Sequence, residues 1–76
     1  MSIKTKTGWF LTRLLDETAV LFYLEKGRIL EDKPHYVLKD EEVLALGYNH
    51  PLETMIPIND KERMVLVLKG VRKDKF

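Results

Sequence analysis

The fold depends on the stretch Asp16-Glu17-Thr18-Ala19-Val20-Leu21-Phe22-Tyr23-Leu24-Glu25-Lys26-Gly27, in which two acidic residues open an apolar run and a glycine closes it. Aspartate accepts hydrogen bonds from the free N–H groups at a helix start, acidic residues there oppose the positive end of the helix dipole, and glycine adopts the left-handed conformation past the last turn. The pattern predicts a principal helix over Asp16–Lys26 that is buried on most of its circumference.

The residues before this stretch leave the start of that helix open. Alternation over residues 3–7 favours a strand or an extended arm that breaks at Gly8. However, Leu11, Leu14 and Leu15 continue the apolar face of the helix at helical spacing, which would move its start to the neighbourhood of Gly8.

The same phrase recurs downstream, where Asp40-Glu41-Glu42 opens a shorter apolar run that Gly47 closes. We expect a second helix over Asp40–Leu46, capped by Asp40 and ended by Gly47, because the signals are those of the first. Between the two predicted helices, Arg28–Leu30 and His35–Leu38 have strand character and are expected to pair across a turn.

The last part of the chain has the pattern of a hairpin. Met55–Ile58 and Met64–Leu68 are apolar and are separated by the polar residues 59–63, a length common in hairpin loops. Pro57 cannot donate to a ladder, which places its strand at a sheet edge and makes Met64–Leu68 the inner strand. Residues 69–76 are expected to fray into a basic tail.

Composition fits one small α+β domain over residues 1–76, with one principal helix, a short second helix and a mainly antiparallel sheet. Residues 1–7 and 72–76 are the segments we expect to be flexible. The chain has no cysteine, so neither a disulfide nor a thiolate metal site reinforces its core. A chain of this size buries little surface, and we therefore expect a partner or a second copy, as in a homodimer, to contribute contact area.

Charge and residue usage suggest a thermophilic source and a cytoplasmic location. Thirteen basic and twelve acidic residues nearly cancel, and 33% of the residues are charged while glutamine and cysteine are absent. Such depletion of heat-labile side chains is typical of thermophiles. The N-terminal residues show no signal peptide, and Arg13, Asp16 and Glu17 interrupt the best candidate for a membrane span. We expect a cytoplasmic protein without membrane contact.

Reactive groups are not arranged for catalysis in this sequence, and we predict no enzyme, no metal, no cofactor and no small-molecule ligand. The acidic pairs Asp16/Glu17 and Glu41/Glu42 are explained by helix starts, although such carboxylates can also act as acid and base. His35 and His50 lack the spacing of a metal motif. The four glycines are scattered, so no phosphate-binding loop is formed.

Two other functions remain, and protein binding is the preferred one. Its surfaces would be the apolar helix and the last strand, through Leu21, Phe22, Tyr23, Leu24, Val65 and Val67, or an open strand edge. The alternative is binding of RNA or single-stranded DNA, with an aromatic ring stacking on a base and cations meeting phosphates. The residues for this alternative are Lys4, Lys6, Trp9, Arg13, Lys69, Arg72, Lys73 and Lys75.

Gly8-Trp9-Phe10-Leu11, followed by residues 17–29, resembles the small non-catalytic N-terminal domain of archaeal tRNA-splicing endonuclease subunits. The resemblance consists of an apolar helix that ends in glycine and a following strand. It carries over no catalytic residue, because that domain has none. It implies a role in assembly or near RNA. The sequence as a whole thus predicts a non-enzymatic interaction module, a small subunit, adaptor or regulator.

Overall fold

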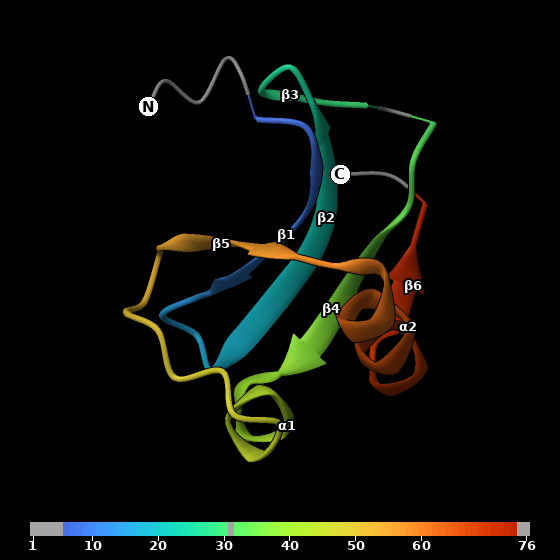
Figure 1. The fold of residues 1–76 in the computed structure, drawn as a ribbon. Coiled ribbons are helices and arrows are strands. Elements are labelled where there is room, and N and C mark those ends of the chain that lie inside the picture. Colours follow the sequence, from blue (N-terminus) through green and yellow to red (C-terminus); the bar gives the residue numbers. More distant parts are fainter. Residues whose placement is uncertain (1–5, 31, 75–76) are drawn as a thin grey trace.

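Within residues 6–30 and 32–74, which are the residues that the computed structural model describes, the chain forms six strands and two helices (Figure 1). The elements are β1 (Gly8–Arg13), β2 (Thr18–Glu25), β3 (Arg28–Ile29), β4 (His35–Lys39), α1 (Asp40–Ala45), β5 (Met55–Ile58), α2 (Asp60–Lys69) and β6 (Val71–Lys73). All strand pairs are antiparallel, in the order β5-β1-β2-β4-β6, and β3 adds to β2. The predicted α+β class with a mainly antiparallel sheet is confirmed.

The predicted principal helix over Asp16–Lys26 is wrong, because this segment forms β2, the central strand of the sheet. β2 pairs with the whole of β1 through its residues 19–24, and with β4 and β3 on its other side. Its β-branched and aromatic residues favour a strand. An apolar run covered on both faces has no alternation, so periodicity does not separate a buried strand from a buried helix. The alternative start of a helix near Gly8 is wrong too, since β1 begins there.

The helix-capping signals around β2 form turns instead. The Asp16 carboxylate accepts hydrogen bonds from the backbone N–H and the hydroxyl of Thr18, at 3.2 and 2.5 Å, which closes the β1–β2 turn. At the other end, Lys26 and Gly27 have φ angles of 50° and 77° and connect β2 to β3 as a two-residue hairpin loop. Acidic and glycine residues therefore bound a hairpin strand here, not a helix.

The second predicted helix is confirmed as α1, and so is its end at Gly47. Gly47 has a φ of 98°, its N–H donates to the Leu44 carbonyl, and the N–H of Tyr48 donates to the Val43 carbonyl. These two bonds are the pattern of a helix that ends on a left-handed glycine. The predicted capping role of Asp40 is wrong. The N-cap is Lys39, and α1 has no side-chain cap.

The prediction of a C-terminal hairpin is also wrong, although the first of its two strands is present as β5. β5 pairs with β1 at the edge of the sheet, where Pro57 was predicted to place it. The second predicted strand belongs to α2, which begins with a capping box: the Asn59 side chain accepts from the N–H of Glu62, whose carboxylate accepts from the N–H of Asn59. Residues 59–63 are thus a helix start and not a hairpin loop.

Two smaller strand predictions need correction. Residues 28–29 and 35–39 are strands, but both pair with β2 and not with each other. Within the expected basic tail, Val71–Lys73 forms β6 and pairs with β4. The expectation of flexible ends falls partly on residues 1–5 and 75–76, which lie outside the described residues.

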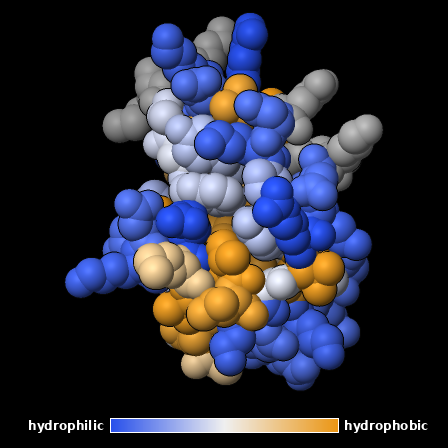
Figure 2. Space-filling view, turned by 90° about the vertical axis from the view of Figure 1, so that its right-hand side faces the viewer, coloured by the Kyte–Doolittle hydropathy of each residue, from blue (hydrophilic) through white to orange (hydrophobic). Residues whose placement is uncertain are grey.

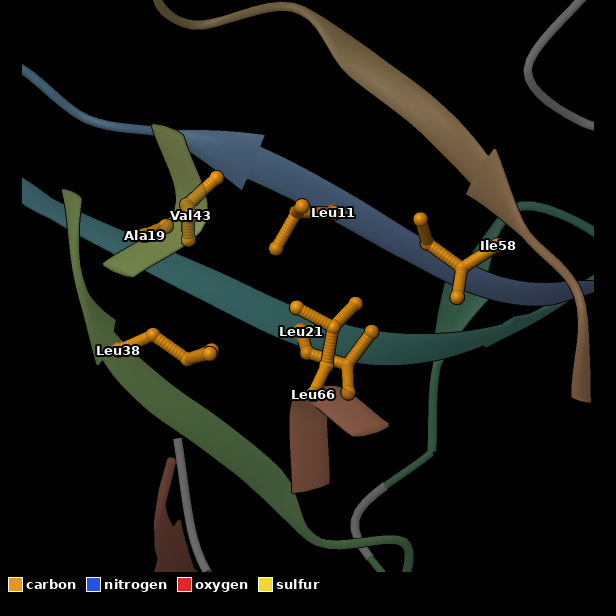
Figure 3. Packing of buried hydrophobic residues seen from close by; sticks show 7 residues of the cluster. All are labelled: Leu11, Ala19, Leu21, Leu38, Val43, Ile58 and Leu66. Atoms are coloured by element: carbon orange, nitrogen blue, oxygen red, sulfur yellow. The ribbon is translucent and has the colours of Figure 1, made fainter. Parts of the chain in front are cut away.

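Both helices cover the same face of the sheet and share one core with it. Figure 3 shows Val43 of α1 and Leu66 of α2 directed at the side chains of β1, β2, β4 and β5. The buried cluster consists of Leu11, Ala19, Leu21, Leu38, Val43, Ile58 and Leu66. No helix in the described residues is long and apolar enough to cross a membrane.

Candidate functional site

In the second half of α2, over residues 64–68, the outer side is apolar like the inner side. Leu66 is fully buried against the sheet, whereas Met64, Val65 and Leu68 are 60%, 44% and 85% exposed. These three lie on one stripe, because residues three and four apart share a face of a helix. Helices that are apolar on all sides are normally covered on all sides. The outer stripe of α2 is therefore a surface of a kind that proteins usually bury.

The end of α1 extends this stripe. Leu46 is 38% exposed and lines, together with Val65, an open groove of about 290 Å³ that Tyr48, Lys61 and Glu62 complete. Figure 2 shows hydrophobic side chains gathered in one patch over α1 and α2, with hydrophilic residues around it. We call the surface formed by Leu46, Met64, Val65 and Leu68 the α1–α2 surface.

Hydrogen bonds hold the two helices in place around the groove. The Tyr48 hydroxyl donates to the Glu62 carboxylate over 2.5 Å, and the other oxygen of that carboxylate belongs to the capping box with Asn59. Burial and the neighbouring Glu62 raise the pKa of Tyr48 to about 12, so its hydroxyl keeps its proton at neutral pH. One carboxylate thus connects the segment that follows α1 to the start of α2, and these bonds fix the residues that line the groove.

A second polar cluster lies at the other end of α1. Arg13 donates twice to the Asp40 carboxylate, at 2.6 and 2.8 Å, and once to the His50 carbonyl at 2.6 Å. The two charged side chains are 13% and 15% exposed. The hydrogen bond with Arg13 lowers the pKa of Asp40. This cluster fastens β1, α1 and the following loop to one another.

The histidines are held neutral by their surroundings. Burial lowers the pKa of His50, the charge of Arg13 lowers it further, and Asp40 and the backbone of Leu11 oppose this. Burial and the charge of Lys73 lower the pKa of His35. Neither imidazole carries a charge that an anion could use at neutral pH.

Part of the predicted acidic set does come together. Asp16, Glu17 and Glu41 line an open pocket of about 500 Å³ with Lys39, Asp40 and Leu44, while Glu42 is outside its lining. Among the described residues, no three His, Cys, Asp or Glu side chains lie close enough to hold a metal ion. The pocket brings these acidic groups together with Lys39 at the β1–β2 turn.

The structure separates the six predicted partner-binding residues. Leu21 and Leu24 are buried, and Val67 packs against the core. Phe22 and Tyr23 are half-buried on opposite faces of β2, where Phe22 lies beside Phe10. Val65 alone of the six belongs to the α1–α2 surface. The prediction of an apolar helix face placed most of these residues in one stripe, which a strand cannot form.

Those residues predicted for nucleic-acid binding that the structure describes do not form one patch either. Arg13 is engaged with Asp40, and Arg72 pairs with Asp74 at 2.8 Å. Lys6 lies over the Phe10 ring, Lys69 ends α2, and Lys73 is in β6. Lys4 and Lys75 lie outside the described residues.

Trp9 belongs instead to an aromatic cluster on three neighbouring strands. Its ring centroid is 5.6 Å from that of Tyr23, with the rings edge to face, and 6.2 Å from that of Tyr36. The Arg63 guanidinium lies 5.6 Å from the Trp9 ring centroid, and the Lys33 ammonium lies 5.3 Å from that of Tyr23. All three rings are half-buried. The cluster combines ring faces with positive charge.

Comparison with known proteins yields no matching family model, no matching characterised protein and no matching solved structure.

Sequence reasoning missed Leu46, Met64 and Leu68. Two signals were present for the residues of α2. Asn59 and Glu62 have the spacing of a capping box, and Lys61, Met64, Val65 and Leu68 recur at helical spacing. For Leu46 there was no local signal, because its exposure depends on how the end of α1 packs against the rest of the fold.

Proposed function

We propose that this chain is a non-enzymatic protein-interaction module, a small subunit, adaptor or regulator, which binds a protein partner through the α1–α2 surface. The observation that carries the proposal is the apolar outer stripe of α2. Burial of an exposed Leu or Met side chain contributes about 1.5–3 kcal/mol. Leu68 and Met64 leave most of this contribution unused in the single chain.

The hydrogen bonds that hold the α1–α2 surface in place also support the proposal. Tyr48, Glu62 and Asn59 fix the two helices, so that binding does not require the groove to form first. A preorganised apolar surface with a polar border has the composition of protein interfaces.

The test compares two leucines that are both highly exposed. Leu68→Glu places a charge within the α1–α2 surface, while Leu15→Glu places one at the β1–β2 turn, where Leu15 is 73% exposed. We expect purified wild-type protein and Leu15→Glu to bind the same protein, either a second copy or a different one, and Leu68→Glu to lose that binding. Retention is read by affinity capture, and each captured protein is then purified and titrated. Binding that survives Leu68→Glu, or absence of any binding, would overturn the proposal.

A second candidate, binding of single-stranded RNA or DNA, is favoured by the cluster of Trp9, Tyr23 and Tyr36. Aromatic faces with nearby cations bind unpaired bases and their phosphates. The ion pairs of Arg63 with Asp60 and of Arg72 with Asp74 reduce the available positive charge. For this reason we rank nucleic acid below protein as the partner.

Trp9 provides the readout for this candidate, since it is the single tryptophan of the chain. If bases stack at the cluster, single-stranded oligonucleotides quench its fluorescence, and added salt reverses the effect. Tyr36→Ala should weaken oligonucleotide binding. Phe22→Ala, on the opposite face of the sheet, is the control and should leave this binding unchanged. Fluorescence that is unchanged by oligonucleotides at low salt would eliminate the candidate.

A further inference from the structure

We infer that the protein bound at the α1–α2 surface is a second copy of this chain, in a two-fold symmetric dimer that packs α1 of one protomer against α2 of the other. This inference rests on the proposed function and names the partner. It is carried by the charges that remain on the two helices once their internal ion pairs are counted.

The charge left over on α2 is net positive. Asp60 pairs with Arg63 at 3.7 Å, so Lys61 and Lys69 outnumber the one remaining carboxylate, Glu62, which accepts hydrogen bonds from Tyr48 and from the backbone of Asn59. Lys61 and Lys69 are exposed and form no ion pair within the described residues. Lys61 borders the groove, one turn before Val65.

The charges left over on α1 are negative. Asp40 is engaged with Arg13, while Glu41 and Glu42 form no ion pair within the same described part of the chain. α1 contains no basic residue. Glu42 precedes Leu46 by four residues, and so it lies on the side of α1 that continues into the α1–α2 surface.

A two-fold axis through the surface brings the negative charge of α1 in one protomer to the positive charge of α2 in the other. In a dimer with such an axis, the same patch is present on both sides, so every contact between α1 and the partner's α2 occurs twice. Glu42 of each protomer then faces lysines of the other, so that this contact occurs twice, with the apolar stripes between them. A partner of uniform charge would match one helix and repel the other.

The size of the chain is compatible with such an interface. A stable complex buries about 800 Å² on each partner. That area is about 15% of the 5394 Å² of accessible surface of this chain, which is more than the four apolar residues supply. The borders of charged residues therefore belong to the contact, and their charges must agree.

The first measurement is mass in solution by analytical ultracentrifugation over a concentration series from about 1 μM to about 1 mM. We expect wild-type protein to shift from monomer to dimer, and Leu68→Glu to raise the dissociation constant at least tenfold, an effect of about 1.4 kcal/mol or more. Leu15→Glu should dimerise as wild type does.

The second measurement exchanges the charges. Protein with Lys61→Glu and Lys69→Glu should be monomeric, because both helices then present acidic groups at the interface, and protein with Glu42→Lys should be monomeric because both helices then present basic groups there. An equimolar mixture of the two should form a heterodimer, in which acidic helices meet basic ones twice. Glu25→Lys and Lys26→Glu, at the far β2–β3 hairpin, are matched controls that leave wild-type dimerisation intact. Circular dichroism confirms that each variant is folded.

The outcomes separate this inference from the function on which it rests. A wild-type chain that stays monomeric at the highest concentration, or a dimer that ignores both Leu68→Glu and the exchange of charges, would overturn the inference. If such a monomer still binds a different protein and loses it in Leu68→Glu, the proposed function stands without the dimer. If no protein binds through this surface, both fall.

Discussion

The inner and outer faces of α2 carry similar side chains in opposite environments. Leu66 is fully buried, whereas Leu68, two residues later, is 85% exposed. A strand that changes face at every residue would place Leu66 and Leu68 on the same side. A helix places them about 200° apart. The difference shows that exposure here is set by the helical turn and by the sheet on one side of it, not by hydrophobicity.

The inner face should respond most strongly to change. Leu66→Ala removes a fully buried side chain that belongs to the same core cluster as Leu21 and Leu38, and we expect a loss of about 2–5 kcal/mol in the free energy of unfolding. Urea denaturation monitored by circular dichroism measures it. A loss below about 1 kcal/mol would mean that α2 contributes little to the core and would remove the contrast between its faces.

The link between the two helices should rank second. Glu62→Ala removes an acceptor for Tyr48 and half of the capping box, for which we expect a loss of about 1–2 kcal/mol. Glu62→Gln keeps an acceptor oxygen and should lose less. Equal losses for the two variants would indicate that the charge of Glu62, not its hydrogen bonds, holds the helices together.

Acidification should lower the free energy of unfolding. The pKa values of His50 and His35 are lowered in the folded chain, so the unfolded chain binds more protons. The free energy of unfolding is therefore highest above about pH 6.5, the ordinary pKa of histidine, and declines as the pH falls from there towards the lowered values. Asp40, whose pKa is also lowered, adds a loss at more acidic pH.

Urea midpoints measured through this pH range check the expectation. His50→Gln cannot take up a proton and should show a smaller decline than wild type between neutral and mildly acidic pH. A decline of unchanged size in that variant and in His35→Gln would assign the pH dependence to other groups.

The outer face should respond least in stability. At a concentration where the chain is monomeric, Leu68→Glu should change the free energy of unfolding by no more than about 0.5 kcal/mol, as expected for exposed positions. Leu15→Glu should behave in the same way. Loss of the fold in Leu68→Glu alone would show that Leu68 supports the monomer, and the contrast with Leu66 would disappear.

The parts of the fold that the sequence predicted correctly are those with local punctuation. Gly47 ended α1 where expected, because only a residue that tolerates a positive φ continues the chain there. Pro57 placed β5 at the sheet edge, because it cannot donate to a second neighbour.

The two long apolar segments were predicted the wrong way round. Residues 18–25 form a strand and residues 64–68 belong to a helix. Runs without polar interruption carry no period, so only their flanking residues remain to decide. Asp16 and Gly27 serve hairpin turns as well as they serve helix ends, and the pair Asn59 and Glu62 gave the better signal for α2.

The candidate site was predictable in kind but not in place. Excess apolar surface on a short chain was expected, and the α1–α2 surface is of that kind. Of the predicted residues, Val65 alone is part of it, since Leu21 and Leu24 became buried once their segment formed the central strand.

The sequence by itself determined that α1 ends at Gly47 and that the strand with Pro57 lies at the sheet edge, because these features depend on single residues and their neighbours. It also determined that nearly half of the residues are apolar and that the charges almost cancel. The tertiary structure alone decided that the segment at residues 18–25 is the middle of a sheet, that Arg13 reaches Asp40, and that one side of α2 stays uncovered. Those outcomes depend on pairing between distant segments, which no local pattern specifies.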